Sequence, residues 1–377
     1  MAQSCRLLQS ISSEFAQTRP FENMMIGTGI HLEPKTVALL LTLQVGGARV
    51  IATGNLNTTQ PEAVAYLAAR NVEVVGRPTS DPAEHDGYVG GVLSHRPDLL
   101  LDNGGDLFTR YLEAPYATLL GGTEETTSGR MRLEPLRGRL RRPILVINDS
   151  PIKQFAENEH AVGQSVFESF MRITNRATHG RRVVVFGYGA CGKGVAATFR
   201  NGFAAVSVVE TDPVLRLQAN LDGFPVPARE TALAEADIVV TVTGAEDVVT
   251  DKDLDLFKDG AILLNAGHFP NEIAVERIAA DARVTTVSEP ADGITTYALS
   301  DGREVHLLTG GHMVNLAGPH PLGNSIESMD LGFALQARCL EAVATGQVDP
   351  DAVVVPVPGF IDRQVAQAYL ALDGPAQ

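Results

Sequence analysis

The clearest chemical signal in the sequence is a run of three glycines that follows an apolar stretch. The apolar residues Val183–Phe186 lead into Gly187, Gly189 and Gly192, and an alanine-rich helical pattern comes next. In a dinucleotide fingerprint the first glycine permits a tight turn, the second lets the backbone approach a pyrophosphate, and the third lets helix and strand pack closely. The N-terminus of the following helix then faces the phosphates. This segment therefore predicts a dinucleotide site.

The residues around the fingerprint favour NAD over other nucleotides. A second strand is predicted at Ala205–Asp212 and carries Glu210 near its end. An acidic side chain there accepts hydrogen bonds from ribose hydroxyls and repels a 2'-phosphate. A triphosphate-binding loop is the competing interpretation, since Lys193 also has the right spacing. That loop needs Ser or Thr next for magnesium, and Gly194 stands there instead. Glycines that serve only a turn between strand and helix are the structural alternative.

Length, charge and cysteine content restrict the class of protein. A chain of 377 residues can build two domains, and its net charge of −15 would on average repel a nucleic-acid backbone. The 3 cysteines have no paired spacing, so we expect a reducing cytoplasm, no disulfide framework and no metal site. No apolar run approaches the roughly 20 residues that a membrane span requires.

The elements that must position these residues alternate between helix and strand. Up to about residue 155 the patterns predict helices at Thr36–Leu43 and Pro61–Arg70, and strands at Ala48–Thr53, Val72–Val75 and the start of Pro97–Asp106. Ligands of open α/β sheets bind beyond the carboxyl ends of strands, which is where Asp102, Asn103 and Asp106 would lie. The first part is thus predicted to be a substrate domain.

The rest of the chain extends the nucleotide domain and then leaves it. Strands are predicted at Ala236–Thr243 and Ala261–His268, and a helix at Ser325–Thr345. We expect a substrate domain over 1–155, a Rossmann NAD domain over 163–316, and a helical segment over 321–377 that returns to the first domain or to a partner subunit. The fold class is therefore α/β, with a Rossmann domain inserted in an α/β substrate domain.

Eight segments together resemble one family. They are His31–Thr36, Asn55–Gln60, Leu101–Leu107, Glu124–Gly129, Asn148–Lys153, Gly187–Gly194, Gly267–Phe269 and Val314–Leu316. In this order they are similar to the S-adenosyl-L-homocysteine hydrolases over nearly the whole chain. The resemblance implies a two-domain enzyme that holds NAD tightly, takes a purine nucleoside or nucleoside thioether between its domains, and forms a homodimer or homotetramer.

The chemistry that the resemblance implies is redox-neutral. NAD oxidises the ribose 3'-hydroxyl, the ketone acidifies the 4'-hydrogen, a base removes that hydrogen, and the 5'-substituent leaves. Water then adds, and the ketone is reduced again. The cofactor stores the hydride, while the protein supplies orientation and proton transfer.

Individual roles are implied by position in the matched segments. Lys153 and Glu157 would handle the 3'-hydroxyl and the 4'-hydrogen, with Asp102 as the other candidate base, and His31 would protonate the leaving group. His268 would belong to a gate between the domains. The implied substrate contacts are Glu33, Gln60, Asn103, Glu125, Thr126, Asn315 and His320. The implied NAD contacts are Thr126, Thr127, Ser128, Asn158, Gly187, Gly189, Ala190, Cys191, Gly192, Glu210, Thr243, Gly244, Gly267, His268 and Asn315.

Departures from the family pattern leave the reaction open. Asn103 replaces the second of two adjacent aspartates, Glu33 replaces a threonine, and Pro61 replaces an aspartate. The family's C-terminal lysine and tyrosine are also missing, so we expect weaker NAD retention. The preferred hypothesis is a nucleoside 5'-dehydratase that gives a 4',5'-unsaturated nucleoside, which would suit nucleoside-antibiotic biosynthesis. Hydrolysis of S-adenosylhomocysteine is the alternative enzyme activity. A catalytically inactive NAD-binding protein is disfavoured, because it would not need Lys153 and His31.

Overall fold

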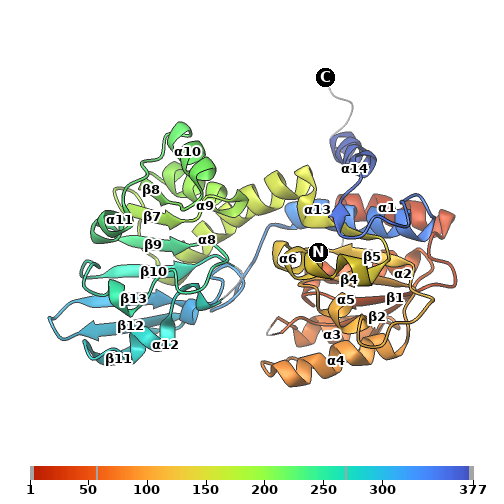
Figure 1. The fold of residues 1–377 in the computed structure, drawn as a ribbon, viewed down its shortest axis with the longest axis horizontal. Helices are drawn as coiled ribbons and strands as arrows, with labels where there is room; N and C mark the ends of the chain where they lie inside the picture. Colours follow the sequence, from red (N-terminus) through yellow and green to blue (C-terminus); the bar gives the residue numbers. More distant parts are fainter. Residues whose placement is uncertain (1–3, 57, 268–269, 373–377) are drawn as a thin grey trace. The chain divides into compact units, whose positions relative to one another are not determined.

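The computed structural model describes residues 4–56, 58–267 and 270–372, which form two compact units (Figure 1). The first unit contains the described residues up to Gln154 together with those from Ile326 onward, and the second is Phe155–Ser325. The second unit is therefore an insertion in the sequence of the first. The chain is α/β, because each unit is built around a sheet of mainly parallel strands.

The first unit contains a parallel seven-stranded sheet in the order β14-β6-β5-β4-β1-β2-β3. The strands are β1 (Met25–Gly29), β2 (Arg49–Thr53), β3 (Glu73–Val74), β4 (Leu99–Asp102), β5 (Gly121–Glu124), β6 (Ile144–Val146) and β14 (Val355–Pro356). Successive strands run outward from β1 to β2 and β3, whereas β4, β5 and β6 extend in the other direction. The order reverses between β1 and β4, and the crevice at such a reversal is where open α/β sheets bind ligands.

The helices of the first unit cover both faces of this sheet. They are α1 (Arg6–Thr18), α2 (Pro34–Val45), α3 (Pro61–Ala68), α4 (Pro82–Ser94), α5 (Asp106–Tyr111), α6 (Thr127–Leu133), α7 (Arg137–Leu140), α13 (Ile326–Ala344) and α14 (Gly359–Leu372). Helices α1, α2 and α13 pack against one another, and α13 also contacts β4 and β5. On the other face, side chains of α4 and α5 join an apolar core with Ile51, Leu100 and Ile144 of the sheet.

The second unit contains another seven-stranded sheet, in the order β11-β12-β13-β10-β9-β7-β8. Its strands are β7 (Arg182–Phe186), β8 (Ala205–Val209), β9 (Ile238–Thr241), β10 (Ala261–Asn265), β11 (Val284–Ala291), β12 (Ile294–Leu299) and β13 (Glu304–Leu308). Strands β8, β7, β9, β10 and β13 are parallel, while β12 is antiparallel to both of its neighbours. The order reverses at β7, directly before the glycine fingerprint.

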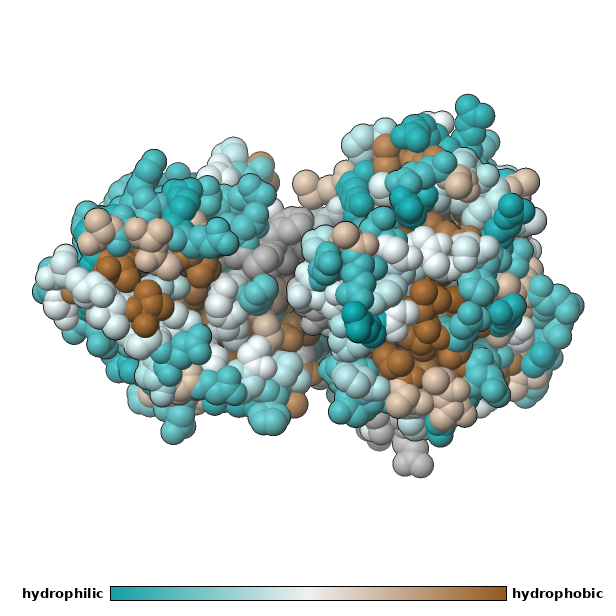
Figure 2. All heavy atoms as spheres, turned by 90° about the horizontal axis from the view of Figure 1, so that it is seen from below, coloured by the Kyte–Doolittle hydropathy of each residue, from teal (hydrophilic) through white to brown (hydrophobic). Residues whose placement is uncertain are grey.

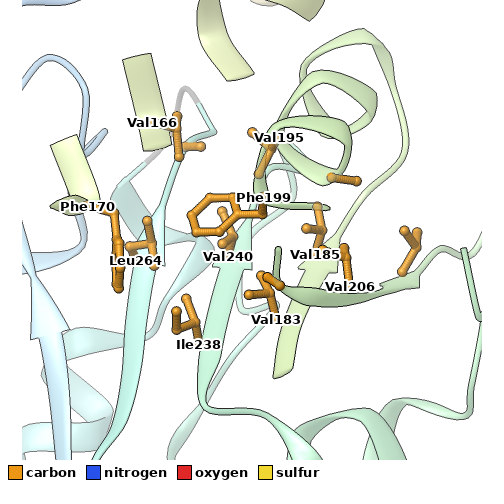
Figure 3. Packing of buried hydrophobic residues seen from close by; sticks show 14 of the residues in the cluster. Val166, Phe170, Val183, Val185, Val195, Phe199, Val206, Ile238, Val240 and Leu264 are labelled. Atoms are coloured by element: carbon orange, nitrogen blue, oxygen red, sulfur yellow. The ribbon is translucent and has the colours of Figure 1, made fainter. Parts of the chain in front are cut away.

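Both faces of the central strands β7, β9 and β10 are buried, which explains why these strands are continuously apolar. Val183 and Val185 of β7 belong to one apolar cluster, whereas Val184 and Phe186 belong to another. Alternate residues of a strand point to opposite faces, so a strand covered on both sides is apolar throughout. Figure 3 shows the first cluster, in which Phe199 of the helix after β7 packs over strand side chains.

The helices of the second unit supply these covers. They are α8 (Val162–Thr174), α9 (Ala190–Asn201), α10 (Pro213–Leu221), α11 (Arg229–Glu235) and α12 (Val275–Ala279), and a π-helical segment, Lys153–Ala161, precedes α8. Helices α8 and α9 cover one face, and α11 lies over the other, where Leu233 joins the second cluster.

The predicted strand Ala205–Asp212 is shorter in the structure because of its acidic end. The strand stops at Val209, and the Glu210 carboxylate then accepts the backbone N–H groups of Thr211 and Asp212. Asp212 in turn caps α10. These side chains replace the ladder hydrogen bonds that a longer strand would have made.

The surface is mainly hydrophilic on the face shown in Figure 2, with hydrophobic residues gathered in separate areas of each unit. Within the described ranges, no helix is long and apolar enough to cross a membrane.

Candidate functional site

Polar residues follow four strands at the carboxyl edge of the first sheet. His31 comes two residues after β1, Asn55 two residues after β2, Asn103 directly after β4, and Glu125 directly after β5. The carboxyl ends of parallel strands meet at one edge, so segments far apart in sequence are brought together here. This edge of the first unit is the candidate substrate site.

His31 is held by the loop that follows β2. Its Nδ1 atom lies 2.7 Å from the hydroxyl oxygen of Thr58, and the ring is half-buried. The backbone N–H of Gln60 donates to the carbonyl of Leu32 at 2.8 Å, which ties the same loop to the segment carrying His31. Gln60 itself is the residue before α3, and its side chain is half-buried. An imidazole held in one orientation is suited to proton transfer.

Asn103 lies in a row of hydrogen bonds that crosses three strand ends. The Asn55 side-chain amide donates to Asn103 Oδ1 at 2.8 Å, and the Asn103 Nδ2 group donates to a Glu125 carboxylate oxygen at 2.8 Å. Glu125 is buried, and its carboxylate oxygen accepts the hydrogen bond, so the Asn103 amide must turn its Nδ2 group toward Glu125. An aspartate at this position would place two carboxylates in contact, so the amide is the residue that suits these neighbours.

Asp102, a candidate base, is fully buried in the turn after β4. Its two carboxylate oxygens accept the backbone N–H groups of Asn103 at 3.0 Å and Phe108 at 2.9 Å. Burial raises the pKa of Asp102 to about 7. In the structure this carboxylate therefore fixes the backbone that carries Asn103.

Glu124 is a second buried carboxylate, paired in register with Asp102 on the neighbouring strand. It accepts the backbone N–H groups of Gly104, Gly105 and Thr126 at 2.7–3.0 Å. Burial, followed by the nearby Asp102, raises the pKa of Glu124 well above its usual range. The two carboxylates thus fasten the glycine turn to the strand ends that carry Asn103 and Glu125.

Glu33 has a protein cation beside it. Its carboxylate lies 3.4 Å from the Lys35 ammonium, and the exposed fractions of the two side chains are 20% and 7%. Burial raises the pKa of Glu33, although Lys35 opposes that shift. The free-energy cost of desolvating the Glu33 carboxylate is therefore offset in part by Lys35. The neighbouring charge of Glu125 also acts on Glu33, which places both acids in one electrostatic environment.

The residues after β5 begin α6 through a side-chain cap. The Thr126 hydroxyl donates to Glu124 at 2.7 Å and accepts the backbone N–H of Gly129 at 2.9 Å. Ser128 is half-buried, and its hydroxyl oxygen lies 3.1 Å from that of Thr126. The Asn148 amide donates to the hydroxyl of the exposed Thr127 at 2.8 Å. The expected ligand contacts Thr126 and Thr127 are thus also part of the local scaffold.

Lys153 is buried at the end of the segment that follows β6. Its exposed fraction is 6%, and that of Glu157, four residues later, is 5%. The boundary between the units falls between them, so Lys153 belongs to the first unit, whereas Glu157 and the half-buried Asn158 belong to the second. Burial of a lysine disfavours its charged form, which is the condition for lysine to act as a base.

The glycine fingerprint of the second unit has the geometry that a dinucleotide requires. Gly187 has a φ of 98°, and a Cβ added there would lie 2.6 Å from the Val242 carbonyl oxygen. A Cβ on Gly192 would lie 2.2 Å from the Gly187 carbonyl oxygen. A Cβ on Gly189 would meet nothing within 4 Å, which leaves open space for a pyrophosphate.

A pocket of about 830 Å³ lies beside this turn, and Gly187, Gly189, Glu210 and Thr243 are among its lining residues. Ala190 and Cys191 begin α9 at the adjoining helix N-terminus. Glu210 also accepts the backbone N–H of Tyr188 at 2.8 Å, which holds the acid at the pocket. An acidic wall, a glycine turn and a helix N-terminus together fit NAD rather than NADP.

Comparison with known proteins decides the family. The model of the S-adenosyl-L-homocysteine hydrolase NAD-binding domain matches residues 158–320, and the model of S-adenosyl-L-homocysteine hydrolase matches residues 3–116. The chain belongs to the S-adenosyl-L-homocysteine hydrolase family. It is accordingly an NAD-dependent enzyme of that family, as the resemblance of its motifs predicted.

Individual relatives match nearly end to end. An S-inosyl-L-homocysteine hydrolase from Methanothermobacter thermautotrophicus is 39% identical over 97% of this chain and 88% of its own. An adenosylhomocysteinase from Thermococcus kodakarensis is 38% identical over 98% of this chain and 88% of its own. An adenosylhomocysteinase from Thermotoga maritima is 38% identical over 97% of this chain and 91% of its own.

Glu272 is a site residue of this family member that sequence reasoning missed. It is fully buried, and its carboxylate accepts the N–H and hydroxyl of Thr243, both at 2.9 Å, and the N–H of Gly244 at 2.7 Å. A Cβ on Gly267 would lie only 1.6 Å from the same carboxylate. Glu272 thus binds two expected NAD contacts, Thr243 and Gly244, and packs closely against a third, Gly267. No local pattern marks it, because its partners lie on other strand ends.

Of the remaining expected site residues, two belong to the second unit and one lies outside the described residues. Asn315 is buried in the second unit and donates to the Ser165 hydroxyl of α8 at 3.0 Å. His320 is exposed, with a φ of 49°. His268 lies outside the described residues.

Proposed function

We propose that this enzyme hydrolyses an S-nucleosyl-L-homocysteine thioether to a purine nucleoside and homocysteine. The names of the relatives favour thioether hydrolysis over the nucleoside dehydration that the substituted motifs suggested. The observation that supports it most strongly is the hydrogen-bonded series Asn55–Asn103–Glu125 at the crevice of the first sheet, in the same unit as the buried Lys153. Such a series can orient a sugar, while a buried lysine can exchange a proton with it.

The chain's own residues would then orient the sugar and move protons. Glu125 accepts hydrogen bonds and would hold the ribose hydroxyls. Lys153 and Glu157 would take the protons of the 3'-hydroxyl and the 4'-carbon and return them after water has added. His31 would protonate the sulfur as homocysteine leaves, since an imidazole can give up a proton near neutral pH. NAD, when bound, supplies a temporary store for the hydride of the 3'-carbon.

Glu33 and Lys35 would meet the purine, because they present an acceptor and a donor side by side. Adenine offers an N6 amino donor next to the N1 acceptor, and hypoxanthine offers an N1–H donor next to the O6 acceptor. The pair can satisfy either edge. This agrees with relatives that are named for both adenosyl and inosyl substrates. We therefore propose a 6-aminopurine or 6-oxopurine nucleoside thioether as the substrate.

The test is direct product analysis of the NAD-loaded enzyme. S-adenosyl- and S-inosyl-L-homocysteine are supplied separately, and the released nucleoside and homocysteine are measured by mass spectrometry. We expect homocysteine from at least one of them, and exchange of the nucleoside 4'-hydrogen in deuterated water. Lys153→Ala should abolish that exchange while NAD remains bound. Loss of water from a free nucleoside, without any homocysteine from the thioethers, would establish the dehydratase in its place.

A further inference from the structure

The segment that carries Lys153 is fixed by one buried hydroxyl. Ser150 is fully buried, and its Oγ accepts the backbone N–H groups of Ile152 at 3.1 Å and of Lys153 at 3.4 Å. The Ser150 carbonyl accepts the N–H of Gln154 at 3.0 Å. Ser150 therefore closes the turn from which the lysine side chain departs.

This arrangement leaves only the hydrogen of the Ser150 hydroxyl for a further hydrogen bond. A serine hydroxyl has two acceptor lone pairs and one hydrogen, and the two N–H groups use both lone pairs. The hydrogen must then point at an acceptor. Asp362, in the first turn of α14, supplies that acceptor, with its Oδ1 atom 2.5 Å from Ser150 Oγ. The contact joins residues 212 positions apart in the sequence.

We propose that Asp362 is a positioning residue for Lys153 and acts through the Ser150 hydroxyl. The inference rests on the proposed function, in which Lys153 moves the protons of the sugar. Asp362 holds the Ser150 hydrogen, the oriented hydroxyl holds the backbone at Lys153, and that backbone sets where the ammonium group can reach. A misplacement of about 1 Å in a reacting group can reduce a rate about 100-fold.

The requirement on position 362 is for an acceptor and not for a charge. Asn has a carbonyl oxygen of similar reach, so Asp362→Asn should keep most of the rate. Leu has the same branched shape but no acceptor, so Asp362→Leu should lower kcat about tenfold to 100-fold with little change in KM. Asp362 also lies at a helix N-terminus, where a carboxylate stabilises the helix by itself. A purely stabilising role would not separate kcat from KM.

The experiment compares Asp362→Asn, Asp362→Leu, Ser150→Ala and the double variant Asp362→Leu/Ser150→Ala as NAD-loaded full-length enzymes. Measured quantities are kcat, KM and the rate of 4'-hydrogen exchange in deuterated water. Asp362→Leu and Ser150→Ala should each reduce kcat and the exchange rate together. The double variant should be no slower than the slower single variant, because both substitutions break the same hydrogen bond. Ile361→Val is the matched control, since it trims a buried side chain of α14 next to Asp362 and leaves both Asp362 and Ser150 in place.

The outcomes separate this inference from the proposed function. If Lys153→Ala retains exchange, the role of Lys153 fails. If Lys153→Ala abolishes exchange but Ser150→Ala and Asp362→Leu keep the parent kcat, the positioning role of Asp362 is overturned. Additive losses in the double variant, or an equal loss in Ile361→Val, would also overturn it. Should Asp362→Leu not fold, Asp362→Ala takes its place with the same expected loss of kcat, because it removes the acceptor without adding bulk.

Discussion

Replacement of Glu272 by alanine should weaken both the second unit and its hold on NAD. The buried carboxylate accepts three hydrogen bonds of 2.7–2.9 Å from Thr243 and Gly244. A hydrogen bond to a charged group contributes about 1.5–3 kcal/mol. Thr243 and Gly244 are exposed, so water can replace part of the loss. We therefore expect the unfolding free energy to fall by about 2–4 kcal/mol.

The effect on NAD follows from the place of Thr243 in the pocket wall. Without the Glu272 carboxylate the turn at Thr243 and Gly244 can move, and NAD binding must then order it at a cost in entropy. The Kd for NAD should therefore rise at least about tenfold. The assays are urea unfolding of the NAD-free protein and calorimetric titration with NAD. Glu276→Ala is the control, because Glu276 is exposed on the neighbouring helix α12 and should change stability by less than about 0.5 kcal/mol. Parent-like values for Glu272→Ala in both assays would refute the anchoring role.

Three further predictions concern the buried acids and the helix packing. Asn103→Asp would place a second carboxylate against Glu125, and two such groups share a proton, so the pH profile of kcat/KM should gain an ionisation. Asp102 has a pKa raised to about 7 by burial, so its stabilising effect is present at low pH and is lost as pH rises through that value. Unfolding free energies measured from about pH 5 to pH 8 should therefore fall less steeply in Asp102→Asn than in the parent. Gly194→Ala would put a Cβ 1.7 Å from the Glu159 carbonyl oxygen, so thermal unfolding should show a loss of several kcal/mol, roughly as for other overpacked sites.

Each of these has a result that would contradict it. An unchanged pH profile in Asn103→Asp would mean that the new acid does not face Glu125. Equal pH slopes for Asp102→Asn and the parent would mean that Asp102 does not carry the shifted proton. Gly138→Ala is the control for Gly194→Ala, since a Cβ there meets nothing within 4 Å. Equal melting temperatures of the two alanine variants would disprove the close helix contact.

The order and type of elements were largely predictable, and their ends were less so. Apolar periodicity placed the helix that the structure shows as Pro34–Val45 and the strand Arg49–Thr53. It did not predict the hairpin strands Val284–Ala291 and Ile294–Leu299, and the residues of the first of these are mostly exposed, so burial leaves little apolar signal in them. Strand ends shifted where side chains such as Glu210 took over backbone N–H groups.

The candidate site was predictable only in part. The motifs located His31, Asn103 and Glu125, since each lies in a short contiguous segment. Asp102 shows the limit: the resemblance made it a candidate base, but only the structure shows that it is fully buried and accepts two backbone N–H groups of the turn after β4. A side chain's neighbours decide whether it meets a ligand or the backbone, and those neighbours are not adjacent in sequence.

By itself the sequence determined the NAD fingerprint, the preference for NAD over NADP through Glu210, and the family. Each of these is carried by residues close together along the chain. The tertiary structure alone decided what joins distant segments: the strand order that reverses between β1 and β4, the Glu272 contacts with Thr243, and the bond from Asp362 to Ser150. Hydrogen bonds between such segments depend on how sheets and helices pack. Local patterns specify an element, but packing specifies which elements become neighbours.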